Sequence, residues 1–538
     1  MRNPTIDNQS AIRNPQSAVT TSRARNSALV AAGILASRVA GLVRQRVFSH
    51  YFGLTAPADA FMAAFRIPNV LNNLFGEGAL SASFIPVYSS LLARNEREEA
   101  DRVAGAVAAL LTVAVSAIVL VGVLATPLLI DVIAPGFTGS TRLLTIRLVR
   151  ILFPSAGLMV MSAWCLGVLN SHHRFFMSYA VGVVWNAVMV VTLLVFGSGA
   201  QLPGLAATLA WGSVIGAGLM FVVQLPIVFS LAPHLRFTPQ YRSSHVRAVV
   251  GNFGPVFVSR GVVQLSAYID TLIASLLPTG AVAALLNAQT IGVLPVSLFG
   301  MSVSAAELPG MSGDMGLDPH ATTKLRDRLN GGLRQIAFFV VPSAVAFFAF
   351  GDVIAAALFK TGRFTQADAV WVWAILAGSG VGLLASTLGR LYSSTYYALK
   401  DTRTPLNYAI VRVVLTTVLG YLCAIPLPHL LGIRETWGAA GLTASAGVAG
   451  WVEMLLLRST LNARIGHSGL PIAYTAKLWT SALTGAAIGW AAKIYVPVSN
   501  SIVGAAIILG AYGVVFFAMT FALRVPEVST IAARLRKR

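Results

Sequence analysis

The chain has 538 residues, of which 56% are hydrophobic and 11% are charged, and its formal net charge at pH 7 is +20. Soluble domains carry about 25% charged residues, so this composition excludes a soluble fold. The basic residues are spread through short connections between apolar stretches. This pattern orients membrane helices and does not indicate nucleic-acid binding.

Residues 1–26 are polar, rich in Ser, Asn and Arg, and lack the apolar segment of a signal peptide. They are expected to form a disordered cytoplasmic tail. Apolar stretches long enough to cross a bilayer, which takes roughly 20 helical residues, then recur along the chain. They predict an all-α polytopic membrane protein with about fourteen transmembrane helices, which begin near residues 27, 59, 103, 143, 177, 204, 246, 281, 333, 366, 405, 437, 474 and 500.

The charges of the connections alternate along this series. One set of connections contains basic residues such as Arg174 and Lys400, whereas residues 53–58, 197–204, 277–281 and 496–501 contain no Lys or Arg. The main exceptions are Arg142, Lys360, Arg363 and Arg434. Basic connections remain in the cytoplasm. Both termini are therefore expected to be cytoplasmic, which requires an even number of spans.

Short sequence pieces recur at an offset of about 220 residues. Ser37-Arg38 is echoed by Ser259-Arg260, and Leu74-Phe75-Gly76 is echoed by Leu298-Phe299-Gly300. Internal repeats are typical of secondary transporters. We therefore expect two six-helix lobes, 27–235 and 236–465, followed by two extra C-terminal helices at 466–525 and a basic cytoplasmic tail at 526–538.

Charged and amide side chains interrupt the first two predicted helices. A charged residue at the centre of a lipid-facing helix costs roughly 2.5 to 3.5 kcal/mol on insertion scales, so these side chains are expected to face a wet cavity or each other. Arg38 and Arg44 are separated by about 120° around a helix and by about 9 Å along it, so both can border one wide cavity that would bind an anion. The candidate substrate-binding residues are Arg38, Arg44, Asp59, Arg66, Asn72, Asn73 and Glu77, with Arg260 as the repeat counterpart of Arg38.

A structural role stays open for several of these residues. Arginines near helix ends can reach the membrane surface, or can pair with Asp59 and Glu77 and hold two helices together. Asp59 at the start of the second helix could also act as an N-cap. Gly76 and Gly78 lie in a stretch interrupted by Pro and Gly and are candidate hinges, with close helix packing as the alternative.

The segment from Ser37 to Pro86 contains Ser-Arg-Val-Ala-Gly, Asp-Ala-Phe and Glu-Gly-Ala-Leu-Ser-Ala-Ser-Phe-Ile-Pro. It resembles the N-terminal signature of the MurJ (MviN) family, and the resemblance extends from about residue 27 to 525. It implies a bacterial inner-membrane protein of the multidrug/oligosaccharidyl-lipid/polysaccharide exporter superfamily. Such a protein would flip lipid II, the undecaprenyl-pyrophosphate-linked peptidoglycan precursor, from the inner to the outer leaflet by alternating access. The resemblance also implies functional roles for Arg38, Arg44 and Asp59.

The chain departs from the family pattern at three positions. Many relatives have basic residues near Asn72 and Asn73, and an arginine where this chain has Thr290. A less basic cavity is expected, which leaves the exact substrate open. The alternative is another exporter of the same superfamily, either a polysaccharide-lipid flippase or a cation-coupled drug antiporter. The clustered arginines argue against cationic drugs.

The sequence contains no Gly-Lys pair, so a Walker-type P-loop is absent and ATP hydrolysis by this chain is not expected. Neither an enzymatic activity nor a cofactor is expected. Outward movement of a negative charge across an inside-negative membrane gains about 2.3 kcal/mol per 100 mV, so the membrane potential could drive an anionic lipid. Coupling to Na+ or H+ stays open. Asp270 resembles the position of a cation-site carboxylate in some relatives, but residues 415–420 lack their further acidic ligand.

The expected partners are a lipid-linked anionic substrate and membrane lipids. The chain is expected to be a monomer, and contact with the cell-wall synthesis machinery is left open. A membrane scaffold for cell-wall synthesis, without transport of its own, is the hypothesis from a different class of protein. Flipping by the pure protein in vesicles would exclude it.

Overall fold

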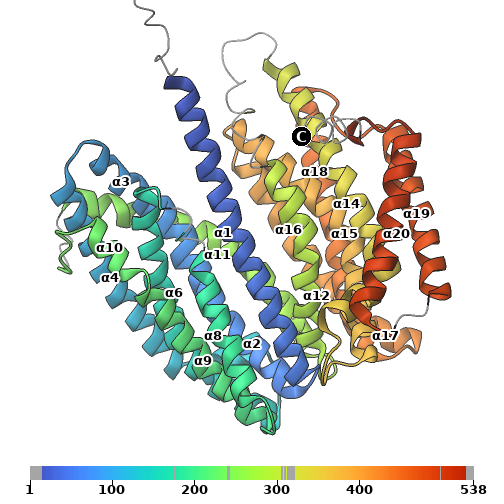
Figure 1. Ribbon diagram of the computed structural model, residues 1–538, viewed down its shortest axis with the longest axis horizontal. Helices are drawn as coiled ribbons and strands as arrows, with labels where there is room; N and C mark the ends of the chain where they lie inside the picture. Colours follow the sequence, from blue (N-terminus) through green and yellow to red (C-terminus); the bar gives the residue numbers. More distant parts are fainter. Residues whose placement is uncertain are drawn as a thin grey trace, which may run out of the picture.

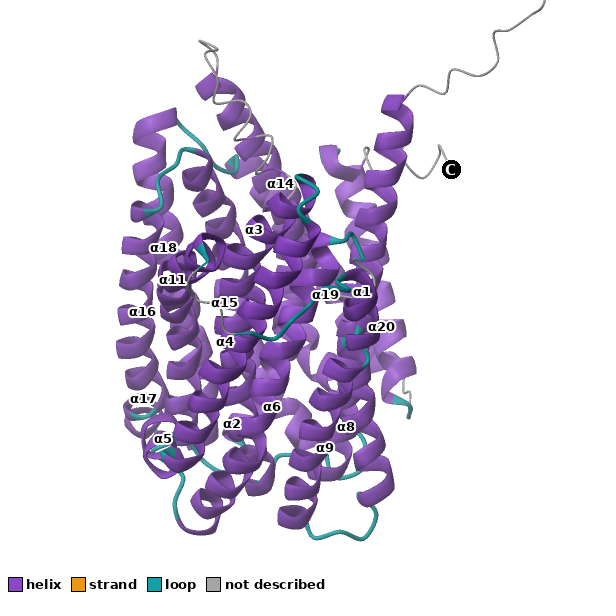
Figure 2. Ribbon diagram, turned by 90° about the vertical axis from the view of Figure 1, so that its left-hand side faces the viewer, coloured by secondary structure: helices purple, strands orange, loops and turns teal. Residues whose placement is uncertain are grey.

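The computed structural model describes residues 15–174, 177, 180–238, 243–304, 307, 311, 321–496 and 499–528. These residues form a bundle of long helices and contain no strand, apart from one isolated bridge between Thr361 and Phe364 (Figures 1 and 2). The prediction of an all-α polytopic fold is confirmed.

The first half of the chain forms α1 (Pro15–Phe52), α2 (Ala56–Leu71), η1 (Asn72–Leu80), α3 (Ser81–Ala93), α4 (Arg97–Leu124), α5 (Thr126–Ile133), α6 (Gly139–Ser171), α8 (Gly182–Phe196), α9 (Leu202–Val222) and α10 (Leu225–Leu231). The second half forms α11 (Ser244–Ser275), α12 (Ala281–Pro295), η2 (Val296–Met301), α14 (Ala321–Phe359), α15 (Gln366–Ala398), α16 (Arg403–Ala424), α17 (Pro426–Leu431), η3 (Glu435–Trp437), α18 (Gly438–Ile465), α19 (Ile472–Tyr495) and α20 (Ser501–Ala522).

The helix series follows the predicted spans. Among the described residues, nine helical segments are long and apolar enough to cross a membrane by themselves. The largest differences are at α1 and α14, which begin at Pro15 and Ala321 rather than near 27 and 333. Hydropathy detects only the apolar part of a helix, whereas backbone hydrogen bonds continue the helix through polar flanks. α1 thus enters the segment that was expected to be a disordered tail.

Most of the helices pack in two groups, and α11 contacts both of them. α2, α6, α8 and α9 pack together in the first lobe, and α14, α15, α16 and α18 pack together in the second. α19 and α20 pack against each other and against α14, and they lie at the outer edge of the second lobe in Figure 1.

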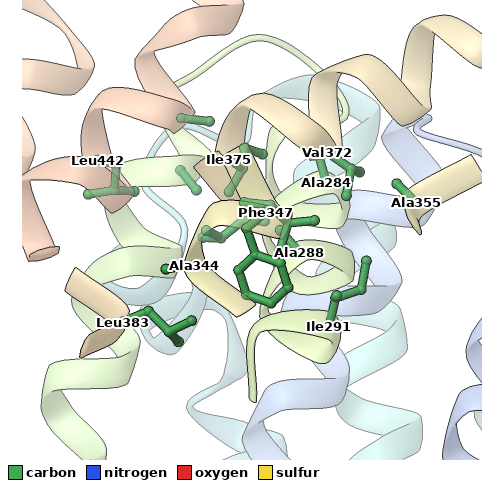
Figure 3. Packing of buried hydrophobic residues seen from close by; sticks show 14 of the residues in the cluster. Ala284, Ala288, Ile291, Ala344, Phe347, Ala355, Val372, Ile375, Leu383 and Leu442 are labelled. Carbon is green, nitrogen blue, oxygen red and sulfur yellow. The ribbon is translucent and has the colours of Figure 1, made fainter. Parts of the chain in front are cut away.

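Small residues let the second lobe pack tightly. In Figure 3, Phe347 of α14 lies among small side chains that include Ala284 and Ala288 of α12. The backbones of Gly382 in α15 and Gly447 in α18 approach so closely that a Cβ on either residue would overlap the other glycine. Close backbone approach through small residues is the usual means of helix association in lipid.

Both lobes contain a π-helical segment at the same place in the repeat. η1 includes Leu74-Phe75-Gly76, and η2 includes Leu298-Phe299-Gly300. Each segment interrupts the second helix of its lobe. π-helical turns are rare and are frequent at functional sites. The weak sequence repeat therefore corresponds to a shared backbone irregularity.

The two ends of the described chain lie at the same end of the bundle. Arg46, near the end of α1, bonds to the carbonyl of Leu358 near the end of α14. At the opposite end, the Tyr474 hydroxyl of α19 donates to the carbonyl of Arg334 near the start of α14, and Lys477 donates to the carbonyl of Leu523 after α20. This arrangement requires an even number of crossings.

Candidate functional site

A cavity of about 680 Å³ lies between the lobes. Its walls come mainly from α1, α2, α6 and α8 of the first lobe and from α12 of the second. Three arginines contribute to the wall, Arg38, Arg44 and Arg66. The spacing of Arg38 and Arg44 predicted that both could border one cavity, and the structure places them there.

Arg44 is held by aromatic rings. Its guanidinium carbon lies 5.0 Å from the centroid of the Phe65 ring and 5.3 Å from that of Trp185. The two rings are stacked on each other with an interplanar angle of 2°. Cation–π contacts of this kind are worth about 0.5 to 2 kcal/mol and leave the guanidinium N–H groups available for hydrogen bonds. The rings therefore orient Arg44 without neutralising it.

Arg66 carries an unsatisfied hydrogen-bond donor. Its Nη1 is buried and has no hydrogen-bond partner among the described residues, although its guanidinium lies 6.0 Å from the centroid of the Tyr268 ring. The carboxylate of Asp270 acts on it electrostatically without an ion pair. A buried donor without a partner is costly, and a ligand oxygen bonded to Nη1 would remove that cost.

Arg38 is exposed to the cavity. Neither an ion pair nor a hydrogen bond of its guanidinium occurs within the described part of the chain. The cavity wall thus combines three guanidinium groups with no carboxylate in direct contact. Such a wall is chemically suited to an anion.

Asp59 lies outside this cavity and joins the two lobes. Its Oδ2 accepts a hydrogen bond from the backbone N–H of Gly280 at 2.5 Å, and its Oδ1 accepts one from Ala283 at 2.8 Å. These N–H groups form the beginning of α12 in the second lobe, where the helix dipole favours a negative charge. Asp59 thus caps the beginning of a helix, as the N-cap alternative proposed. The capped helix is α12 of the second lobe and not its own helix α2.

Three further contacts join the lobes near the same end of the bundle. The Gln45 amide donates to Asn287 Oδ1 at 2.6 Å, and Arg46 Nη1 donates to the carbonyls of Ala357 and Leu358 at the end of α14. His50 Nδ1 lies 2.8 Å from the Thr361 hydroxyl. Sequence reasoning had not singled out Gln45 or His50. Together with Asp59, these residues hold the two lobes together at this end.

Only some of the other predicted site residues line the cavity. Asn72 and Thr290 line the cavity, and the Thr290 hydroxyl donates to the carbonyl of Leu286 in its own helix. Asn73 is not part of the cavity wall. The predicted hinge residues Gly76 and Gly78 fall in η1. The side chains of Glu77 in η1 and Arg260 in α11 lie outside the described part of the structure.

Asp270 lies between two arginines of different lobes. The charges of Arg66 in α2 and Arg412 in α16 both act on its carboxylate, and its Oδ1 is buried without a hydrogen-bond partner. No group of three or more His, Cys, Asp or Glu side chains that could hold a metal ion occurs among the described residues.

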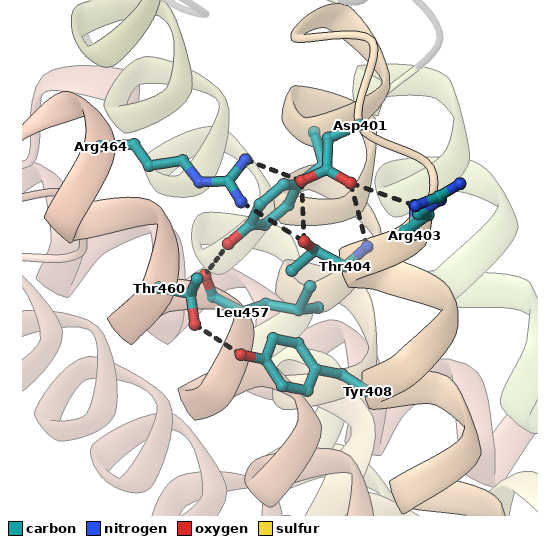
Figure 4. Close-up of polar contacts among 8 residues, drawn as sticks. Asp401, Arg403, Thr404, Tyr408, Leu457, Thr460 and Arg464 are labelled. Atoms are coloured by element: carbon teal, nitrogen blue, oxygen red, sulfur yellow. Dashed lines mark hydrogen bonds and ion pairs between the residues drawn. The ribbon is translucent and has the colours of Figure 1, made fainter.

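The loop between α15 and α16 is fixed by a polar cluster (Figure 4). Asp401 Oδ1 accepts from the N–H groups of Arg403 and Thr404, and Oδ2 accepts from the Thr404 hydroxyl and from Arg464 of α18. These bonds, with those from Thr404 the largest contribution, hold the pKa of Asp401 below its usual range. The cluster caps α16 and ties it to α18, which is a structural role.

A two-lobed helical membrane fold with a polar cavity between the lobes is typical of secondary transporters. The sequence model of the family described as "Lipid II flippase MurJ" matches residues 48–519. The chain therefore belongs to the MurJ family.

Relatives that carry this family name match most of the chain and most of their own length. The lipid II flippase MurJ of Burkholderia cenocepacia is 30% identical over 79% of this chain and 80% of its own length. The probable lipid II flippase MurJ of Rhizobium meliloti is 31% identical over 88% of this chain and 86% of its own length.

Solved structures support the same fold. A lipid II flippase MurJ in an inward closed conformation aligns with a TM-score of 0.76 and 23% identity, over 95% of this chain and all of the other. An inward-facing multidrug transporter of the MATE family aligns with a TM-score of 0.65 and 17% identity, over 79% of this chain and 95% of the other.

Proposed function

We propose that this protein flips lipid II from the inner to the outer leaflet of the bacterial inner membrane by alternating access. The observation that carries the proposal is the set of three arginines in the cavity, none of which has a carboxylate in direct contact among the described residues. Uncompensated charges inside a membrane protein mark the path of a charged substrate. The names of the relatives identify this substrate as lipid II.

The pyrophosphate of lipid II fits this site chemically. Arginine binds phosphate oxygens through two parallel N–H groups, a geometry that lysine cannot reproduce. Arg66 offers a buried Nη1 without a partner, and Arg44 is oriented by its two aromatic neighbours. A cationic drug would be repelled by the same wall, which disfavours the antiporter alternative.

The contacts of Asp59, Gln45, Arg46 and His50 form the closed outer gate in this proposal. The basic connections put the opposite end, with both termini, in the cytoplasm. The structure then corresponds to an inward-facing state that receives the head group from the cytoplasmic leaflet. Reporter fusions after Gly53 and after Asn170 test the topology. They should read outside and inside respectively, and the reverse result would contradict it.

The membrane potential provides the driving force in this proposal, because the cargo is an anion. The positive charge of Arg66, which acts on Asp270, disfavours Na+ as an additional coupling ion. Depolarisation of cells that depend on this protein should therefore slow outward movement of lipid II. If the rate is unchanged, an Asp270→Asn variant should be compared with and without a Na+ or H+ gradient, because those two ions then become the candidates.

The decisive experiment is flipping by the pure protein. Proteoliposomes that contain only this chain should move fluorescent lipid II between leaflets, and the chain should support growth of a bacterium depleted of its own flippase. A chain that moves no lipid in vesicles would be a scaffold. Movement of an undecaprenyl-linked polysaccharide precursor in preference to lipid II would favour the other exporter hypothesis.

A further inference from the structure

The second lobe contains a group of charged side chains that the proposed pyrophosphate site does not use. Arg412 Nη1 of α16 forms an ion pair with Glu453 Oε2 of α18 at 3.1 Å. The charges of both residues also act on Arg390 of α15. Arg412 in turn acts on Asp270, which faces Arg66 of the first lobe.

These groups have alternating sign and lie on five helices. In order from the first lobe they are Arg66 in α2, Asp270 in α11, Arg412 in α16, Glu453 in α18 and Arg390 in α15. The group therefore extends from the cavity wall into the second lobe. It carries one net positive charge.

Arg390 is the member of this group that is available to a ligand. Its side chain is exposed, although Leu388, Gly389, Leu391 and Tyr392 around it in the sequence are buried. Neither a hydrogen bond nor an ion pair of its guanidinium occurs in the described part of the chain. It lies eight residues before the end of α15, or about 12 Å from that helix end.

Polar side chains lie next to Arg390 on its helix. Ser386, Ser393 and Ser394 lie three or four residues from Arg390, and Tyr397 lies seven residues from it. All four share its helix face, and none of them is fully buried. A lipid-facing helix surface would be apolar at this depth, as it is on the exposed face of α20. This polar face belongs to the same helix end as the Asp401 loop, on the side that the topology puts in the cytoplasm.

We propose that Arg390, with Arg412 beside it, forms a second anion-binding subsite in the second lobe, and that it binds a carboxylate of the peptide part of the cargo. The inference rests on the proposed function. The pyrophosphate occupies the arginines of the first lobe. The peptide is the remaining part of lipid II that carries negative charge, and Arg390 is an arginine of the second lobe with no carboxylate bonded to it.

Glu453 sets the strength of this subsite. Its ion pair neutralises Arg412, so only one of the two arginines is free for a ligand in this conformation. Replacement of Glu453 by glutamine removes that charge and makes the second guanidinium available. The proposed subsite therefore predicts that Glu453→Gln gains affinity and that Arg390→Gln loses affinity. A purely structural role of these residues does not predict the gain.

The test compares two cargoes on the full-length protein in nanodiscs. The probes are lipid II and the same undecaprenyl-pyrophosphate disaccharide without its peptide. Arg390→Gln should weaken lipid II binding roughly tenfold, the size of one charge-assisted hydrogen bond, and should leave binding of the peptide-free lipid unchanged. Glu453→Gln should tighten binding of lipid II alone. Arg434→Gln, which removes an exposed arginine from the loop before α18, is the matched control and should change neither.

Two results would overturn the subsite. One is wild-type affinity of Arg390→Gln for lipid II. The other is an equal loss for both cargoes, which would mean that Arg390 acts on the pyrophosphate or on the whole protein. Binding of both lipids to the wild-type protein is measured first. If the wild-type protein binds neither lipid, the proposed function itself fails, and this failure is distinguished from a failure of the subsite alone.

Discussion

The contact of Asp59 with the second lobe makes a quantitative prediction about the equilibrium between inward-facing and outward-facing states. Its two oxygens accept hydrogen bonds from Gly280 and Ala283, and these bonds must break when the outer gate opens. Hydrogen bonds to a charged group contribute about 1.5 to 3 kcal/mol each. Asparagine keeps one carbonyl acceptor and removes the desolvation cost of the buried charge. We therefore expect Asp59→Asn to destabilise the closed outer gate by about 2 kcal/mol, which shifts the equilibrium roughly thirtyfold.

Distance measurements between spin labels can detect this shift. Labels at Ser198 in the first lobe and Leu430 in the second are both exposed on the gate end, after replacement of the native Cys165 and Cys423. Asp59→Asn should increase the fraction of molecules with the longer distance between the labels, relative to the labelled protein with the native Asp59. Asp131→Asn is the matched control, because Asp131 pairs with an arginine of its own lobe at the same end. Equal populations in the two variants would refute the assigned role of the gate.

Three further predictions concern binding, acid stability and packing. Arg38→Ala or Arg44→Ala should abolish complementation of a flippase-depleted strain while the amount of protein in the membrane stays near normal; growth of the double variant would contradict the anion site. Asp401→Asn should lower the thermal unfolding temperature at pH 7 in detergent. Hydrogen bonds hold the folded-state pKa of the Asp401 carboxyl below its usual value of about 3.9. The stabilisation by this carboxylate is therefore complete above that value and is lost as the pH falls through the folded-state pKa. The difference in unfolding temperature between wild type and variant should shrink in acid and should not grow. Gly382→Val should reduce the yield of folded protein in size-exclusion chromatography because its side chain meets the backbone of Gly447, whereas Gly510→Val, at a position with open space, should not.

The positions of the helices could be predicted because the signal is local. Each span is a run of apolar residues, and the structure places helices at nearly all of the predicted positions. Arg38 and Arg44 could be assigned to one cavity for the same reason, since their relative orientation depends only on the geometry of one helix. The polar flanks of α1 and α14 were missed because a polar residue does not end a helix in water.

The contacts between the lobes could not be predicted because their bonds join segments far apart in the sequence. Gln45 and Asn287 are separated by 242 positions, and Arg46 and Leu358 by 312. Asp59 bonds to backbone N–H groups, which have no side-chain signature. The Arg412–Glu453 ion pair was missed in the same way, because each residue alone resembles an isolated polar group in a span. Only the docking of the helices brings these groups together.

Thr290 provides a test of whether the positive charge of the cavity is the property that matters. The resemblance to the family implies an arginine at this position, and the structure places Thr290 on the cavity wall, with its hydroxyl bonded only within α12. A longer cationic side chain can therefore enter the cavity without breaking a contact between helices. Thr290→Arg should tighten binding of lipid II and should partly restore complementation to Arg66→Gln, because it returns one positive charge to the same cavity. Thr290→Gln has similar length without charge and should do neither. If the glutamine variant rescues equally well, side-chain size and not charge limits the cargo, and the anion-cavity mechanism loses its main support.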